Sequence, residues 1–387
     1  MSDVVIRNIG TIVTGDIAHP IADGDTIVTR EGKIAYVGGE DGADTNAIRA
    51  VVDAAGATVM PGLCDNHVHP VLGDFTPRQS QFDFIDSSLH GGVTTMISAG
   101  EPHTPGRPTD PVGVKALTIL AHKSFAKLRP SGVKVHAGAV MLEPGLTEDD
   151  FTEMADAGVS LVAEIGISGV KDADEAATMT RWAQARGMRV MVHTGGASIP
   201  GSGVIGADFV VKVQPDVAGH TNGGPTAPPL SDVERILEET SARIEVVHNG
   251  NVKAAAAVAR LAAERGELHR MVIGTDSPAG SGVQPLGILR VMSWVTALGD
   301  VPPEAAVAMA SGNIAALHGL NTGVIEVGME ADLVVVDAPL GSQADDALGA
   351  LAVGDTLAVA AAIIDGSWRF TKSRNTPPAS RPIMFVG

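Results

Sequence analysis

Apolar runs alternate with amphipathic segments between residues 57 and 320, and this alternation restricts the fold more than any other feature. After the apolar stretch that leads into "HVHP" (67–70), β-branched runs recur at residues 92–100, 132–140, 158–166, 187–195, 215–223, 243–250 and 270–280. Segments with helical spacing lie between them, including 150–158, 172–187 and 252–266. Eight strands alternating with helices predict an α/β fold, a TIM-like (β/α)8 barrel. A doubly wound open sheet is the alternative, but no Gly-rich dinucleotide fingerprint follows the first strand of the series.

The two ends of the chain have a different pattern, with short β-branched runs and turns. Residues 26–39, "TIVTREGKIAYVGG", predict a hairpin around "EGK", and residues 359–373 predict hairpin-like structure near the C-terminus. We expect residues 1–56 and 321–387 to form one small β-sandwich domain beside a barrel of residues 57–320. The last stretch, from residue 374, is expected to be an extended arm.

Charge, cysteine content and hydropathy argue against several classes of protein. The formal net charge is −18, so no basic face is expected to bind nucleic acid. Cys64 is the single cysteine, which rules out an intramolecular disulfide and a cysteine-rich zinc site. We find neither a run of about 18 apolar residues nor a signal-peptide pattern, so we expect a cytoplasmic protein without a membrane span.

Histidine and carboxylate side chains stand where five of the predicted strands end. In a (β/α)8 barrel the carboxyl ends of the strands form one rim, and the active residues lie there. Neutral imidazole and carboxylate groups are the ligands that divalent ions take. The candidate metal ligands, from strands one, four, five, six and eight, are His67, His69, Glu164, His193, His220 and Asp276.

Six ligands are too many for one open tetrahedral ion and suit two ions. Glu164 is the expected bridge, because a carboxylate can bind one ion with each oxygen. We expect His67, His69 and Asp276 to hold the more buried ion and His193 and His220 to hold the other. A bridging hydroxide would complete both coordination shells.

Other polar residues near the expected rim are candidates for substrate binding. His103 and His248 follow strands two and seven, and Arg78 and Lys171 are cations that could pair with a substrate carboxylate. The alternative for each is an ordinary loop residue, bonded to the backbone or to water. We interpret His19, His90, His122, His269 and His318 as surface or packing residues, and Cys64 as a packing residue. His136 stands within strand three, and we expect it either to line the barrel or to fill a gap.

Several motifs together resemble the amidohydrolase superfamily. They are "PGLCDNHVHP" (61–70), "SLHGGVTTMISAG" (88–100), the acid on strand four, the single histidines on strands five and six, the aspartate on strand eight and "GVIEVGMEADLVVVD" (323–337). The resemblance covers nearly the whole chain. It implies a two-metal centre with the same six ligands, but it does not specify the substrate.

A narrower likeness points to the enamidase family. It is carried by "HTGGASIPGSG" (193–203), "GHTNGGPTAPP" (219–229), "PLGILR" (285–290), "GLNTGVI" (319–325) and "TKSRNTPPA" (371–379). This resemblance implies hydrolysis of 6-oxo-1,4,5,6-tetrahydronicotinate to 2-formylglutarate and ammonia. It also implies zinc, alone or with iron, and a homo-oligomer such as a tetramer. "SPAGSG" (277–282) and "HNGN" (248–251) depart from the enamidase pattern, so the resemblance specifies the chemistry more closely than the substrate.

The expected site predicts a mechanism. Two cations lower the pKa of a bridging water and polarise an amide carbonyl. Asp276 then takes the proton of the attacking hydroxide and passes it to the leaving nitrogen. The alternatives are another amidohydrolase activity (dihydroorotase-like, deacetylase-like or deaminase-like) and a non-catalytic scaffold. A scaffold is expected to lose ligands, whereas all six positions are filled here.

Overall fold

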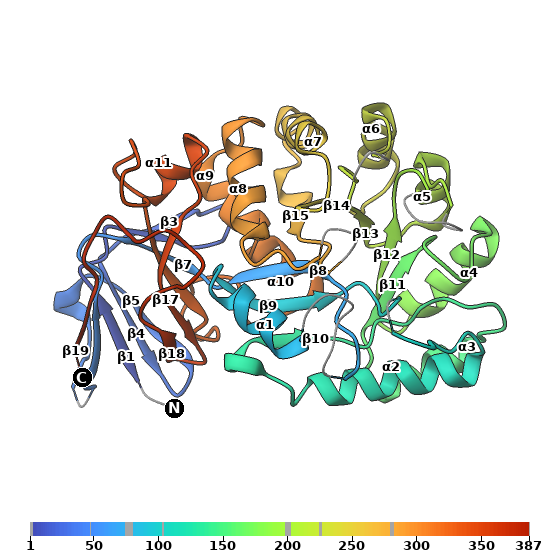
Figure 1. The fold of residues 1–387 in the computed structure, drawn as a ribbon, viewed down its shortest axis with the longest axis horizontal. Coiled ribbons are helices and arrows are strands. Elements are labelled where there is room, and N and C mark those ends of the chain that lie inside the picture. Colours follow the sequence, from blue (N-terminus) through green and yellow to red (C-terminus); the bar gives the residue numbers. More distant parts are fainter. Residues whose placement is uncertain are drawn as a thin grey trace.

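The computed structural model describes residues 3–46, 48–73, 80–102, 104–197, 203–223, 227–278 and 282–386 (Figure 1). Helices surround a central group of strands, and the strands from the two chain ends lie together at one side. Within the described ranges, every helix is too short or too polar to span a bilayer.

The central strands form a closed ring and confirm the predicted barrel. They are β8 (Leu63–Val68), β9 (Val93–Ser98), β10 (Lys134–His136), β11 (Leu161–Ile165), β12 (Arg189–His193), β13 (Val217–Gly219), β14 (Arg243–Val247) and β15 (Met271–Gly274). One sheet has the order β10-β9-β8 and the other the order β11-β12-β13-β14-β15, with parallel pairing in both. Parallel bridges join them at both seams, Val68 to Ser277 and Val140 to Val162. All eight strands predicted from the apolar runs are therefore present.

Helices follow the barrel strands and lie on the outside of the ring (Figure 1). They are α1 (Gln81–Leu89), α2 (Pro111–Phe125), α3 (Glu148–Asp156), α4 (Ala173–Gln184), α5 (Ala207–Val213), α6 (Leu230–Glu239), α7 (Val252–Glu264), α8 (Gly287–Ala297), α9 (Pro303–Met309) and α10 (Gly312–His318). Short 3-10 turns are η1 (Glu40–Gly42), η2 (Pro130–Gly132) and η3 (Leu268–Arg270). Side-chain caps fix several helix starts: the Asp172 carboxylate accepts from the backbone N–H groups of Asp174 and Glu175 at α4.

The barrel interior is closed by a small apolar cluster. It consists of Cys64, Ile97, Ala139, Met141, Leu161, Ala163 and Val272 from the strands and loops, with Ile314 from α10. Burial raises the pKa of the Cys64 thiol to about 12, so the thiol stays protonated. Cys64 is therefore a packing residue, as its apolar neighbours predict.

The chain ends form two sheets with a shared core. One has the order β19-β6-β1-β4-β5 and the other the order β18-β17-β16-β7-β2-β3. Their strands are β1 (Val4–Arg7), β2 (Thr11–Val13), β3 (Ile21–Ala22), β4 (Thr26–Arg30), β5 (Lys33–Gly38), β6 (Ala50–Asp53), β7 (Thr58–Pro61), β16 (Leu333–Asp337), β17 (Ala358–Ile364), β18 (Ser367–Phe370) and β19 (Met384–Val386). The helix α11 (Ala347–Ala352) lies between β16 and β17 in sequence and packs on α8 and α9. The predicted hairpins are β4–β5 and β17–β18, and the expected C-terminal arm ends in a strand that pairs with β6.

The central strands β7 and β16 of the six-stranded sheet are buried on both faces, which attaches the sandwich to the barrel. Along β16, Leu333 and Val335 belong to the core between the two sheets, whereas Val334 and Val336 belong to the core that continues into the barrel. This alternation is the two-residue period of a strand. β7 pairs with β16 and leads through Gly62 into β8, so the chain enters the barrel directly from the sandwich. The domain limits at residues 56 and 321 remain a prediction.

Candidate metal centre

The first two candidate ligands and the last one are held by the seam between β8 and β15. The Asp276 N–H donates to the His67 carbonyl (2.8 Å), and the His69 N–H donates to the Ser277 carbonyl (2.7 Å). Asp65 supports the same seam, because its carboxylate accepts from the Thr275 hydroxyl (2.6 Å) and from the backbone N–H of His67 (3.1 Å). Two neighbouring strand ends therefore bring residues about 210 positions apart to one point.

His67, His69 and Asp276 form a first triplet. The Nε2 atoms of the two histidines lie 3.3 Å apart, and Asp276 Oδ1 lies 3.2 Å from His69 Nε2 and 3.6 Å from His67 Nε2. The other ring nitrogens are occupied: His67 Nδ1–H donates to Glu245 Oε2 (2.7 Å) and His69 Nδ1–H donates to the Gly100 carbonyl (3.0 Å). With Nδ1 carrying the proton in both rings, two lone pairs and a carboxylate oxygen converge.

Glu164, His193 and His220 form a second triplet. Glu164 Oε2 lies 3.0 Å from both His193 Nδ1 and His220 Nε2, and these two nitrogens lie 2.8 Å apart. The second oxygen, Oε1, lies 3.4 Å from His69 Nε2 in the first triplet. Because Oε2 also lies 3.8 Å from His67 Nε2 in the first triplet, Glu164 stands between the two triplets, the position that the predicted bridge requires.

The charges of the two triplets act on one another. Burial opposes ionisation of Glu164, but the neighbouring His193, His220 and His67 hold the pKa of its carboxyl well below the usual range. Burial likewise opposes ionisation of Asp276, and His67, His69 and His220 lower its pKa. Burial also disfavours the charged form of His67, yet Glu245, Asp276 and Glu164 raise the His67 pKa well above its usual value. The buried carboxylates therefore favour positive charge on the groups that face them.

The donor set fits two divalent cations. Each triplet offers three ligand atoms within 4.8 Å of one another. Lone pairs of His67 and His69 that face each other at 3.3 Å cannot form a hydrogen bond when both Nδ1 atoms carry the proton, so the arrangement favours a cation between them. His220 and Asp276 also have positive φ angles (34° and 59°), a conformation that non-glycine residues adopt mainly where the surroundings impose it.

The four candidate substrate-binding residues are not gathered in the same way. Arg78 and His103 lie outside the described residues. Lys171 is exposed just before α4, and the His248 ring stacks on Trp294 of α8 with 5.1 Å between ring centroids. A role in substrate binding remains a prediction for all four.

Sequence reasoning missed a second layer of polar residues behind the triplets. Glu245 and Asn66 are fully buried, and Asn66 Nδ2–H donates to Glu245 Oε1 (2.7 Å). His318 Nε2–H donates in turn to Asn66 Oδ1 (2.8 Å), so this packing residue also supports the site. One feature of the sequence could have indicated Glu245: it is an acid within the otherwise apolar run "RIEVV" (243–247). That pattern does not show which residue the carboxylate contacts.

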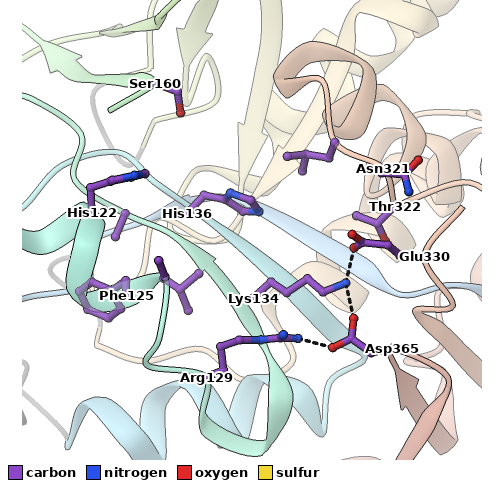
Figure 2. Close-up of a pocket in the computed structure, with 14 residues that line it drawn as sticks. His122, Phe125, Arg129, Lys134, His136, Ser160, Asn321, Thr322, Glu330 and Asp365 are labelled. Carbon is purple, nitrogen blue, oxygen red and sulfur yellow. Dashed lines mark hydrogen bonds and ion pairs between the residues drawn. The ribbon is translucent and has the colours of Figure 1, made fainter. Parts of the chain in front are cut away.

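A separate cavity of about 360 Å³ lies at the other end of the barrel strands, beside the first residues of β10 (Figure 2). Its charged groups pair with one another. Lys134 contacts Glu330, Asp332 (2.6 Å) and Asp365 (3.0 Å), and Arg129 contacts Asp365 (2.7 Å). These ion pairs join the barrel to the sandwich, and the described residues around this cavity include no converging set of metal ligands like that at the opposite rim.

Known proteins resemble this chain over its full length. The Amidohydrolase family profile matches residues 58–369. An enamidase from Eubacterium barkeri is 54% identical over 381 residues, covering 98% of this chain and 99% of the relative. The crystal structure of an enamidase at 53% identity superposes with a TM-score of 0.96 and covers all of both chains.

More distant relatives share the architecture. An imidazolonepropionase from Mycolicibacterium smegmatis is 25% identical over 383 residues, covering 88% of this chain and 92% of the relative. A D-hydantoinase structure from Thermus sp. superposes with a TM-score of 0.67 at 19% identity, covering 97% of this chain and 96% of the other, which supports the fold alone.

Proposed function

Because this chain belongs to the amidohydrolase family, we propose that it is a metal-dependent hydrolase that opens the C–N bond of a cyclic amide. The observation that carries the proposal is the pair of ligand triplets that share Glu164. The substrate class follows the enamidase relatives, and the ring we propose is 6-oxo-1,4,5,6-tetrahydronicotinate, opened to 2-formylglutarate and ammonia.

His67, His69 and Asp276 would hold one cation, His193 and His220 the other, and Glu164 both. When bound, two divalent ions supply hydroxide near neutral pH and polarise the amide carbonyl. We propose zinc, alone or with iron. We further propose a cytoplasmic homo-oligomer whose substrate carries a carboxylate.

Asp276 is the group we assign to proton transfer. Its side chain is 19% exposed, whereas the other five candidate ligands are at most 6% exposed, so it is the ligand most open to a substrate. The carboxylate accepts the proton of the attacking hydroxide as the C–O bond forms. It returns that proton to the nitrogen as the C–N bond breaks. For a cyclic enamide, the released enamine then hydrolyses to an aldehyde and ammonia.

The position of Asp276 is supported from the next strand. The Asn249 side-chain amide donates to the Asp276 carbonyl (2.5 Å), and the Asn249 N–H donates to the Thr275 carbonyl (3.1 Å). These bonds hold the backbone in its positive-φ conformation, which aims the carboxylate at the two imidazoles. The Asp276 carboxylate is therefore placed before substrate arrives, as general acid–base catalysis requires.

Ammonia release from a panel of rings tests the proposal. The panel contains the tetrahydronicotinate lactam, a hydantoin, dihydroorotate, imidazolonepropionate and adenine. We expect activity on the lactam, and we expect Asp276→Asn to reduce kcat/KM by about 10³-fold. Asp337→Asn, which alters a buried carboxylate in the sandwich, is the matched control and should keep wild-type turnover.

Two results would contradict different parts of the proposal. Activity on another ring with none on the lactam would replace the substrate and keep the mechanism. Wild-type protein that is folded but binds no metal and releases no ammonia would overturn the hydrolase assignment itself.

A further inference from the structure

Glu245 of β14 is a buried carboxylate that no Lys or Arg of the described residues pairs with. Its side chain is fully buried, and three donors converge on it. They are His67 Nδ1–H (2.7 Å) and the His220 backbone N–H (3.0 Å), both to Oε2, and Asn66 Nδ2–H (2.7 Å) to Oε1. Burying a carboxylate is costly unless hydrogen-bond donors compensate it, so the three donors to Glu245 are needed at this position.

The Oε2 atom of Glu245 reaches both ligand triplets. His67 belongs to the first triplet and His220 to the second, and one oxygen accepts from both residues. The backbone of Glu245 adds to the second contact, because its carbonyl accepts from the N–H and the hydroxyl of Thr221, the residue after His220 (both 2.8 Å). His220 is thereby held in its positive-φ conformation.

Neighbouring strands leave room for this arrangement. On β15, a Cβ added at Gly274 would lie 2.6 Å from the His67 Cβ and 3.3 Å from Glu245 Oε1. Glycine at that position therefore lets the His67 ring and the Glu245 carboxylate meet. Along β14, Ile244 and Val246 belong to the apolar core on the helix side, so Glu245 is on the opposite face, toward the barrel interior.

We propose that Glu245 is a positioning residue that couples the two halves of the metal centre. It keeps the proton of His67 on Nδ1, so the Nε2 lone pair is available to an ion, and it fixes the backbone from which His220 extends. The inference rests on the proposed two-metal function and deepens it, because it assigns one carboxylate to the support of both ions.

The isosteric change Glu245→Gln tests this directly. Three donors face the two carboxylate oxygens, but glutamine has one oxygen and one NH₂ group. If the NH₂ group replaces Oε1, it faces the Asn66 donor and no hydrogen bond forms there. If it replaces Oε2, it faces His67 and His220, and the His67 Nδ1 atom can accept only by giving up its proton. We expect the affinity for both ions to fall together, by about 10- to 100-fold each.

The measurement is zinc titration of the apoprotein against a chromophoric chelator, with metal content by mass spectrometry and unfolding followed by circular dichroism. Asp337→Asn is the matched control: it also changes a buried carboxylate to an amide, and it should lower stability without changing metal affinity. If Glu245 has a merely structural role, Glu245→Gln should lower the unfolding midpoint of the apoprotein and leave its affinities for both metal ions at wild-type values.

The outcomes separate this inference from the proposed function. If wild-type protein binds two ions and Glu245→Gln binds them equally well, or weakens only one, the coupling role is overturned. If wild-type protein binds none, the proposed function itself fails. Should Glu245→Gln not fold, Asn66→Ala decides: it removes the Oε1 donor, and an unchanged affinity for both ions would also overturn the inference.

Discussion

The two ends of the barrel gather buried polar groups in opposite ways. At the amino end, beside β10, each carboxylate has a cationic partner: Lys134 contacts Glu330, Asp332 and Asp365, and Arg129 contacts Asp365. At the carboxyl end, no Lys or Arg of the described ranges forms an ion pair with Glu164 or Asp276. The carboxylates of Glu164 and Asp276 contact imidazoles instead.

The difference distinguishes a structural cluster from a functional one. The carboxylates around Lys134 neutralise its charge, so this cluster needs no added ion. Its ion pairs join the barrel to the sandwich. In each triplet, carboxylate oxygens and imidazole nitrogens converge, and this donor set suits a divalent cation. Burial alone does not identify a site, whereas buried ligand atoms that converge without a Lys or Arg partner among the described residues favour a metal site.

Removal of the shared carboxylate should have the largest effect. Glu164→Gln keeps the shape of the side chain but removes the charge between the triplets. We expect metal affinity to fall by more than about 100-fold, beyond the loss typical of residues behind the ligands, and turnover to be lost. Metal content and ammonia release measure both, and a variant that retains two ions would remove the basis for calling Glu164 a bridge.

Removal of metal by a chelator should affect the carboxyl end of the barrel, where the candidate ligands lie, and not the Lys134 cluster at the amino end. Apoprotein prepared with a strong chelator is expected to lose activity and to unfold about 4 kcal/mol more easily than protein held at 1,000 times the dissociation constant in zinc. Added zinc should restore both properties. Equal stability with and without metal would contradict an ion-binding carboxyl end.

The amino-end cluster should matter for stability only. Lys134→Met leaves Asp332 buried without its cation, and we expect a loss of about 3 kcal/mol in the free energy of unfolding, measured with urea. Lys212→Met is the matched control, because its pair with Asp174 is exposed and should contribute less than about 1 kcal/mol. A change in the metal content of Lys134→Met would contradict a purely structural role for the amino-end cluster.

Glu101, just after β9, extends the comparison to pH. It accepts from the Leu72 N–H (3.0 Å), and burial raises the pKa of its carboxyl to about 7. The unfolded chain releases this proton near pH 4.5, whereas the folded chain keeps it to about 7. Wild-type stability should therefore fall relative to Glu101→Gln as pH rises through this interval, by about 3 kcal/mol.

Urea unfolding of both proteins at pH 5, 6, 7 and 8 measures this difference. Parallel stability curves for wild type and Glu101→Gln would show that Glu101 titrates normally. That result would contradict the raised pKa of this buried carboxyl group.

The six candidate ligands could be predicted because each stands within or directly after an apolar run. The parallel strands of a barrel bring all their carboxyl ends to one rim, so strand order alone places His67 near Asp276 across 209 positions of sequence. Glu245 could not be assigned in this way. It lies inside a strand, and only the observed pairing shows that its side chain faces His67. His318 was interpreted as a packing residue because nothing local in α10 indicates that its ring meets Asn66, 252 positions away.

The sequence by itself therefore determined the barrel, and it was enough to predict a two-sheet domain from the chain ends and six candidate metal ligands. These depend on periodicity and on residue type, which are local properties of the chain. Only the tertiary structure decided how Glu164 stands between the two triplets, which ring nitrogen of His67 and of His69 is occupied, and that Glu245 contacts both halves of the centre. Those features depend on distances of about 3 Å between side chains far apart in sequence, and such distances exist only once the strands have paired.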